Sequence, residues 1–373
     1  MTIDIAALAT PGIATLPPYR PGKSAEEVQR ELGLTNVIKL ASNENSLGPS
    51  KKVLDALASG GFDLCRYPDG SGSSLKRAIA DYHGVSPGQI TLGNGSNDVL
   101  ELAARSIVTS AHEVIYSENA FIVYHLATHS IGATPVVIPT RDQSHDLAAM
   151  LDAISGRTRL IFIDNPGNPT GRWIGKDQLR SFLASVPEDV IVVVDEAYYD
   201  YAASLCDDYP NSTDYLADFP NLVTTRSFSK AYGLAGLRVG YAISHPDLAD
   251  LMNRVRQPFN VNSLALLAAE VALEDQEHLR RCVAMNDQGM QTLTAAFADL
   301  GMEWFESIAN FVSFDLARPA GPVYQAMLQE GVVVRPLVEY GLPNHLRVTI
   351  GQEYENAIFL NALDKVSATY FSL

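Results

Sequence analysis

The run of branched apolar residues at positions 190–194, Val-Ile-Val-Val-Val, limits the folds open to this chain more than any other feature. It is far too short to span a bilayer, and it lacks the alternation of a strand with one wet face, so it predicts a strand buried on both faces. Strands of this kind belong to mostly parallel sheets covered by helices. Further strands are expected at residues 89–92, 113–116, 135–138, 159–163, 222–226 and 240–243.

These strands alternate with helical stretches, such as residues 96–107, and together they predict an α/β fold with a mostly parallel central sheet. After Asn253 the pattern changes to long helices and a few short strands, which is typical of a smaller α+β domain. A length of 373 residues accommodates two such domains. We therefore expect an arm rich in Pro and Gly at residues 1–45, a large domain at 46–255 and a small C-terminal domain at 256–373.

The net charge and the cysteines argue against several kinds of binding partner and site. A formal net charge of -16 argues against nucleic acid or an anionic membrane as a partner, because both require basic patches. Cys65, Cys206 and Cys282 are far apart, which argues against a zinc site or a disulfide framework. The first twenty residues show no secretory pattern. The sequence therefore predicts a soluble, cytoplasmic protein without a metal site.

The segment at residues 227–240, Ser-Phe-Ser-Lys-Ala-Tyr-Gly-Leu-Ala-Gly-Leu-Arg-Val-Gly, is the strongest candidate for chemistry. Lys230 follows a predicted strand, and a lysine shielded from water there can act as a neutral nucleophile. The hydroxyls of Ser227 and Ser229 and the guanidinium of Arg238 are suitable ligands for a phosphate. The alternative is a solvated lysine after a strand, with the glycines serving turns.

Polar residues follow two other predicted strands. Asp195 comes directly after the apolar run 190–194, at the end of a parallel strand where α/β proteins bind ligands. It could instead be a nucleotide-site carboxylate or a helix cap, but the chain has no Gly-Lys-Ser/Thr loop for a nucleotide. Asn168 lies in the turn 165–171, where it could reach a ligand on the sheet or serve the turn alone.

Two further features indicate anion binding. Ser96 and Asn97 follow a glycine loop at the start of a predicted helix, where backbone N–H groups can bind an anion or where the polar side chains simply cap the helix. Arg335 and Arg347 lie within apolar, strand-like runs. Because a buried guanidinium needs an anionic partner, these arginines predict either a carboxylate clamp or internal salt bridges.

Taken together and in this order, the motifs resemble those of the aspartate-aminotransferase-like superfamily of pyridoxal-phosphate (PLP) enzymes. Within it the chain looks like the histidinol-phosphate aminotransferases. The likeness runs from Tyr19 to the last predicted helix, and residues 40–45, Leu-Ala-Ser-Asn-Glu-Asn, and 66–70, Arg-Tyr-Pro-Asp-Gly, are particular to that branch. Gly167 departs from the family, in which asparagine is commoner at this position.

The resemblance implies a PLP site. Lys230 is expected to hold the cofactor as a Schiff base, Asp195 to pair with its ring nitrogen, and Phe121 to cover the ring. Asn168 and Tyr198 would contact the 3-oxygen. The residues expected at the phosphate are Ser96, Asn97, Ser227, Ser229 and Arg238, with Tyr67 reaching it from the second subunit of a homodimer.

The resemblance also implies the substrates. Arg347 and Asn43 would bind an α-carboxylate, while Arg335 and Tyr19 would face the distal part of the amino donor. The expected reaction transfers the amino group of L-histidinol phosphate to 2-oxoglutarate. An aromatic amino-acid aminotransferase and a decarboxylase of the cobalamin pathway are rivals with the same fold. A PLP-binding transcription regulator is a third rival, against which the acidic charge counts.

Overall fold

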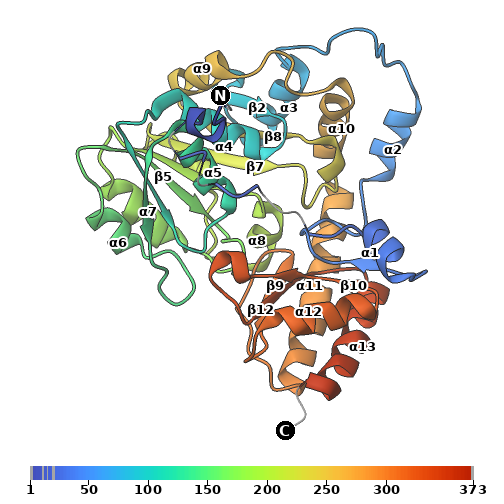
Figure 1. The fold of residues 1–373 in the computed structure, drawn as a ribbon. Coiled ribbons are helices and arrows are strands. Elements are labelled where there is room, and N and C mark those ends of the chain that lie inside the picture. The colour runs from blue at the N-terminus through green and yellow to red at the C-terminus, as the bar shows by residue number, and fades with distance from the viewer. Residues whose placement is uncertain (1–2, 11, 15, 19–21, 371–373) are drawn as a thin grey trace.

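The computed structural model describes residues 3–10, 12–14, 16–18 and 22–370. Its larger part is built around a sheet with the strand order β2-β8-β7-β6-β5-β3-β4 (Figure 1). β8 is antiparallel to β2 and β7, and the other pairs are parallel, so the predicted mostly parallel sheet is confirmed. The strands are β2 (Ile90–Gly93), β3 (Glu113–Ser117), β4 (Thr134–Ile138), β5 (Thr158–Asp164), β6 (Ile191–Asp195), β7 (Leu222–Ser227) and β8 (Gly240–Ser244).

The apolar run that predicted a strand buried on both faces forms β6. Val192 and Val194 pack in one core cluster, and Val193 lies between them on the opposite face in another. Helices cover both faces of the sheet (Figure 1). The helices of this part are α2 (Lys51–Ala58), α3 (Ser73–His83), α4 (Ser96–Ile107), α5 (Ile122–Ile131), α6 (Leu147–Asp152), α7 (Lys176–Ser185), α8 (Tyr199–Leu205), α9 (Pro246–Val255) and α10 (Ser263–Glu274).

The smaller part contains an antiparallel sheet with the order β11-β12-β9, backed by three helices. Its core cluster joins Phe297 of α11, Phe314 of β9 and Phe359 of α13. Its elements are α11 (Gln276–Asp299), β9 (Phe311–Asp315), α12 (Ala320–Gln329), β10 (Val332–Val333), β11 (Arg335–Pro336), β12 (His345–Thr349) and α13 (Glu353–Tyr370).

Part of the predicted N-terminal arm, the segment after residue 22, packs on the small domain. Ser24 caps α1 (Ala25–Leu32) by accepting a hydrogen bond from the Glu27 amide at 3.1 Å, and Gly33 ends the helix. Val28 of this helix packs against Val333, and β1 (Ile38–Lys39) pairs with β10. Ser24, the acidic residues Glu26 and Glu27 of the first turn, and Gly33 are helix start and stop signals that the prediction overlooked.

The predicted boundary after residue 255 also differs from the packing. Ala265 and Ala268 of α10 belong to the same core cluster as Val192 of the large sheet. The small-domain fold therefore begins within α11, which passes from one part to the other (Figure 1). No helix of the described residues has both the length and the apolar composition to cross a membrane. Short 3-10 helices lie at Ala6–Leu8, Pro87–Gln89, Ser212–Tyr215, Ala235–Leu237 and Val338–Tyr340.

Candidate active site

A cavity of about 360 Å³ lies where the parallel strands β5, β6 and β7 end, and the small domain closes its other side. Tyr67 does not line it, and Tyr19 lies outside the described residues. The other side chains predicted for the site all line this cavity: Asn43, Ser96, Asn97, Phe121, Asn168, Asp195, Tyr198, Ser227, Ser229, Lys230, Arg238, Arg335 and Arg347.

Asp195 ends β6 and is buried at the floor of the cavity. Its carboxylate accepts hydrogen bonds from Tyr124 Oη at 3.1 Å and Thr225 Oγ1 at 2.9 Å. Burial raises the pKa of Asp195 to about 6; the Thr225 hydrogen bond opposes that shift, and the charge of Asp164 adds to it. A cation placed against this carboxylate would lower its pKa again, so the position favours a positively charged ligand atom.

Tyr124 and Thr225 were not predicted for the site. Thr225 lies opposite Asp195 in the parallel register of β6 and β7, so a register assignment would have identified it. Tyr124 comes from α5, and only the tertiary fold brings it to Asp195.

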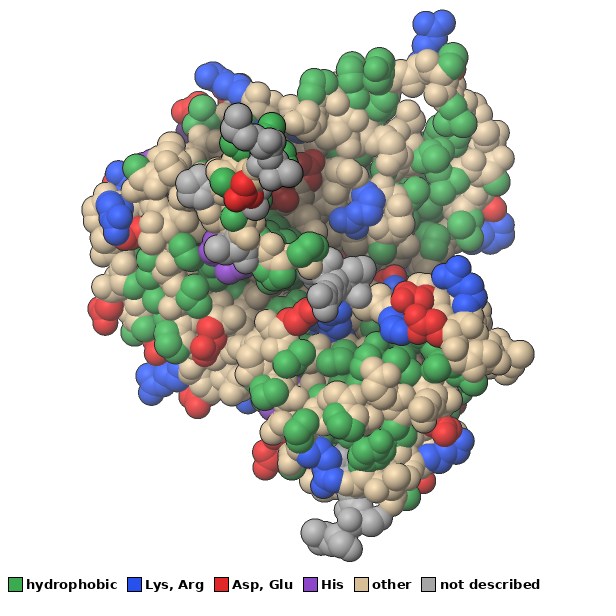
Figure 2. Space-filling view, viewed as in Figure 1, with side chains coloured by type: hydrophobic (Ala, Val, Ile, Leu, Met, Phe, Trp, Pro, Cys, Tyr) green, Lys and Arg blue, Asp and Glu red, His purple; other side chains and the backbone are tan. Residues whose placement is uncertain are grey.

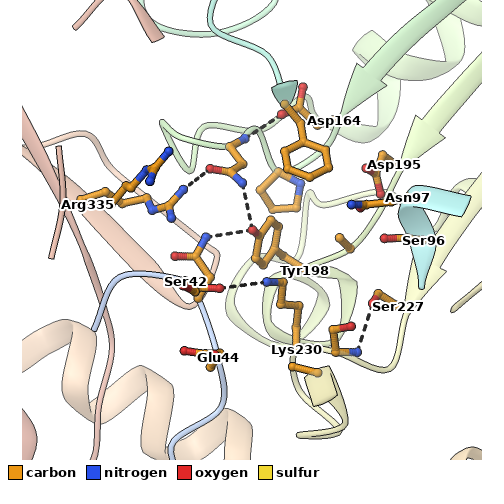
Figure 3. A pocket seen from close by; sticks show the side chains of 18 of the residues that line it. Ser42, Glu44, Ser96, Asn97, Asp164, Asp195, Tyr198, Ser227, Lys230 and Arg335 are labelled. Atoms are coloured by element: carbon orange, nitrogen blue, oxygen red, sulfur yellow. Dashed lines mark hydrogen bonds between the residues drawn. The ribbon is translucent and has the colours of Figure 1, made fainter. Parts of the chain in front are cut away.

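Lys230 follows β7, and its amine points into the cavity, where Nζ donates a hydrogen bond to the Ser42 carbonyl at 3.2 Å (Figure 3). Burial, together with the nearby charge of Arg347, lowers the pKa of this amine to about 8. About a tenth of the amine is therefore neutral at pH 7, and this neutral form can act as a nucleophile or a proton acceptor. Lys230 is partly buried and its amine lies in the cavity, unlike the solvated surface lysine weighed from the sequence.

Backbone and side-chain donors surround one end of the cavity. Ser96 and Asn97 form the first turn of α4, and Arg238 donates to Ser229 Oγ at 3.3 Å. Gly95 has a φ of 85°, and a Cβ there would lie 2.3 Å from the Arg238 guanidinium. Glycine at position 95 thus lets the arginine approach the helix N-terminus, and the two make an anion site.

Tyr198 is the centre of a hydrogen-bond network between the two domains (Figure 3). Its hydroxyl accepts from Asn43 Nδ2 at 2.9 Å and from Asn168 Nδ2 at 3.2 Å. Arg347 donates to Asn168 Oδ1 and, at 2.9 Å, to the Ala41 carbonyl. Burial raises the pKa of Tyr198 above its ordinary value, so the phenol stays neutral and can donate a hydrogen bond to a ligand in the cavity.

Arg335 and Arg347 are direct partners in the antiparallel register of β11 and β12. Both side chains are buried, at 8% and 5% exposure, and both line the cavity. Arg335 forms an ion pair of 2.8 Å with Glu339, whose side chain is 49% exposed. The cavity therefore has two guanidinium groups on its small-domain side, and one of them faces a carboxylate that can move into solvent.

Tyr67 lies apart from this cavity. Its side chain is 81% exposed and stacks on Phe259 at 4.5 Å between ring centroids. Its expected contact with a partner subunit is therefore still a prediction. Among the described residues, no group of three or more His, Cys, Asp or Glu side chains gathers in a way that could hold a metal ion.

Comparisons with known proteins agree with this geometry. The family model "Aminotransferase class I and II" matches residues 35–363. Histidinol-phosphate aminotransferase 2 of Pseudomonas fluorescens is 53% identical over 99% of this chain and 100% of that protein. The protein of the same name from Pseudomonas aeruginosa is 53% identical over 98% of this chain and 99% of its own length.

A solved structure is also similar. The histidinol-phosphate aminotransferase of Sinorhizobium meliloti, in complex with pyridoxal-5'-phosphate, superposes with a TM-score of 0.86. The two chains are 28% identical, and the match covers 97% of this chain and 98% of that one.

Proposed function

Since the chain belongs to the class I and II aminotransferase family, we propose that it is a histidinol-phosphate aminotransferase of histidine biosynthesis. It would transfer the amino group of L-histidinol phosphate to 2-oxoglutarate and release imidazole-acetol phosphate and L-glutamate. The observation that carries this assignment is the register pair Arg335 and Arg347 on the wall opposite Lys230. The names of the relatives support the same reaction.

The residues of the cavity fit pyridoxal phosphate. The anion site around Gly95 and Arg238 suits the phosphate, and the buried carboxylate of Asp195 suits a protonated ring nitrogen. Phe121, Asn168 and Tyr198 line the same cavity, and we expect them to contact the ring and its 3-oxygen. When bound, pyridoxal phosphate supplies an electron sink for the carbanion formed at the donor Cα.

The chain's own groups would then work as follows. The Lys230 amine, with a pKa of about 8, would hold the cofactor and, when free, would accept the proton from the donor Cα. Asp195 would remain ionised opposite a positively charged ring nitrogen and stabilise that charge. Tyr198, held by Asn43 and Asn168, donates a hydrogen bond into the cavity. Ser96, Asn97, Ser227, Ser229 and Arg238 line the cavity and would bind the phosphate.

The two arginines fit the alternating substrates of this reaction. L-Histidinol phosphate carries a phosphate and no carboxylate, whereas 2-oxoglutarate carries two carboxylates. We assign the α-carboxylate to Arg347, with Asn43, and the distal anion of either substrate to Arg335. The Glu339 carboxylate beside Arg335 is half exposed, so an incoming anion can displace it into water.

Steady-state kinetics with two donors test the assignment. Purified enzyme with 2-oxoglutarate should give a much higher kcat/KM with L-histidinol phosphate than with L-phenylalanine. Efficient turnover of phenylalanine without turnover of histidinol phosphate would establish the aromatic aminotransferase instead. A visible spectrum with a yellow chromophore that borohydride bleaches checks the cofactor independently of the donor.

A homodimer with shared sites is the second part of the proposal. Leu54, Leu64 and Tyr67 are exposed by 51%, 83% and 81%, and hydrophobic side chains gather over the α2 region (Figure 2). A partner subunit would cover them and bring Tyr67 to the cofactor phosphate. A cytoplasmic location follows from the proposed pathway and can be checked by cell fractionation.

Hybrid dimers test the shared site. If Lys230→Ala and Tyr67→Ala are each inactive, mixing the two variants should restore part of the activity, because some hybrid sites have both intact residues. A fully active monomer in analytical ultracentrifugation would contradict the dimer.

A further inference from the structure

A second, smaller cavity of about 10 Å³ lies behind the active-site wall, and it contains a buried ion pair that the proposed mechanism does not use. His145 Nε2 lies 3.2 Å from Asp164 Oδ1, and the two side chains are 8% and 5% exposed. Asp164 lines both this cavity and the active-site cavity. Asp164 therefore lies between the active-site cavity and His145, which pairs with it from the second cavity.

Both imidazole nitrogens of His145 have oxygen partners. Nε2 lies 2.9 Å from the Asp164 carbonyl, and Nδ1 lies 2.6 Å from Ser117 Oγ. Burial lowers the pKa of His145, but the hydrogen bond and the charge of Asp164 outweigh burial and the net shift is upward. Arg172 and Asp164 are the other charged residues among the described side chains around this cavity. Both contacts are compatible with an imidazolium that donates from both nitrogens, and the Asp164 carboxylate 3.2 Å from Nε2 is the geometric reason to expect that charge.

Asp164 acts on the active site in two ways. Its Oδ2 accepts the Asn168 amide at 2.7 Å, which holds the turn whose side chain bonds Tyr198 and Arg347 (Figure 3). It also lies opposite Asp195 in the register of β5 and β6, and its negative charge contributes to the raised pKa of Asp195. An uncompensated charge at Asp164 would thus disturb the carboxylate that faces the ring nitrogen.

We propose that His145 is a positioning residue: its positive charge balances Asp164, so that Asp164 can hold the Asn168 turn without adding a full negative charge beside Asp195. Asp164 Oδ1 is buried and lies 3.2 Å from His145 Nε2. The charge of the imidazolium is accordingly what stabilises that oxygen. Because a buried charge without a partner is strongly unfavourable, His145 and Asp164 should act as one unit.

The charge state of His145 is measurable without the cofactor. In ¹⁵N-histidine NMR of the cofactor-free protein at pH 7.5, one buried imidazole should be cationic, and this signal should disappear in His145→Gln. Asp164→Asn should make it neutral. His83 is the matched control: it is partly buried and hydrogen bonded to Tyr241 Oη at 2.9 Å, and desolvation lowers its pKa to about 3, so its signal should be neutral throughout. A neutral His145 in the wild type would overturn the proposal.

A double-variant cycle tests the coupling to the site. His145→Gln keeps a hydrogen-bond donor but removes the charge, so PLP should dissociate more readily and kcat should fall. Adding Asp164→Asn removes the uncompensated carboxylate and should recover about threefold or more of the lost cofactor affinity, as coupled neighbours do. If the losses in the double variant are additive, His145 has only a structural role and the proposal is wrong. As a control, His83→Gln should leave the cofactor affinity unchanged.

The inference rests on the cofactor-binding part of the proposed function, and the two can fail separately. If the wild-type protein does not bind PLP, the proposed function fails. Normal PLP binding together with a neutral His145 or an additive cycle overturns this inference alone. If His145→Gln does not fold, the NMR signal of wild type against Asp164→Asn still decides the charge of the pair.

Discussion

The two walls of the active-site cavity are built differently. The sheet wall holds Asp195 at the end of β6 and Lys230 just after the end of β7, the strand beside it. The small-domain wall holds Arg335 and Arg347 on two short strands, and Arg347 contacts the Ala41 carbonyl, more than 100 residues away. The sheet wall is therefore positioned by two adjacent strands of the large sheet, whereas the small-domain wall depends on how the chain closes over it.

This difference assigns separate tasks to the walls. Groups that act on the cofactor need fixed geometry and shifted pKa values, and the buried strand ends provide both. Groups that bind two substrates of different shape need a charge whose partner can move aside. The Arg335–Glu339 pair at the cavity edge provides this, because Glu339 is half exposed. Substitutions in the sheet wall should hence affect every donor alike, and substitutions in the other wall should discriminate among donors.

The largest effect is expected for Lys230→Ala. Without the amine, no covalent link to the cofactor forms and no buried base accepts the Cα proton, so kcat should fall for every donor by about 10⁴-fold or more. Borohydride treatment followed by mass spectrometry should find no PLP on the protein. Lys365→Ala, at a lysine that is 66% exposed on α13, should behave as wild type. Covalent PLP in Lys230→Ala would place the attachment elsewhere.

A smaller but still uniform loss is expected for Asp195→Asn. The amide retains the hydrogen-bonding shape with Thr225 but cannot stabilise a ring cation, so kcat should fall by about 10²–10³-fold for both donors. The variant should fold, because it removes a buried carboxylate whose pKa is already raised to about 6. Single-turnover spectroscopy on the PLP-loaded variant measures the loss. Wild-type rates would remove Asp195 from the chemistry.

Arg335→Leu should reduce activity unequally for the two donors. A charge-assisted hydrogen bond contributes roughly 1.5–3 kcal/mol, so kcat/KM for L-histidinol phosphate should fall by about 10–100-fold. Phenylalanine carries no distal anion and should lose much less, which makes it the control within one variant. Kinetics with the two donors measure the ratio. Equal losses for both donors would mean that the small-domain wall supports folding of the site and does not select the donor.

The residues that could be predicted from the sequence are those that belong to a local pattern, and the residues that were missed depend mostly on tertiary packing. β6 and the residues Asp195 and Lys230 were predictable because a buried strand and a polar residue at its end form a local pattern. Tyr124 was missed because only tertiary packing brings α5 to Asp195. The helix α1 within the predicted arm was missed although Ser24 and Gly33 mark its start and end in the sequence; only its packing on the small domain through Val28 is non-local.

The smallest effect concerns the pH at which the cofactor attaches to the sheet wall. Burial lowers the pKa of Lys230 to about 8 because it penalises the charged form, so the neutral amine accumulates as the pH rises through that value. The neutral fraction is about 0.1 at pH 7 and about 0.9 at pH 9, whereas an ordinary lysine would gain about 100-fold over the same interval. Chromophore formation from cofactor-free protein and PLP should thus accelerate about tenfold between pH 7 and 9 and then level off. Stopped-flow absorbance measures this rate, and a rise that continues to pH 10 would show that the amine is solvated, which would remove the contrast between the two walls.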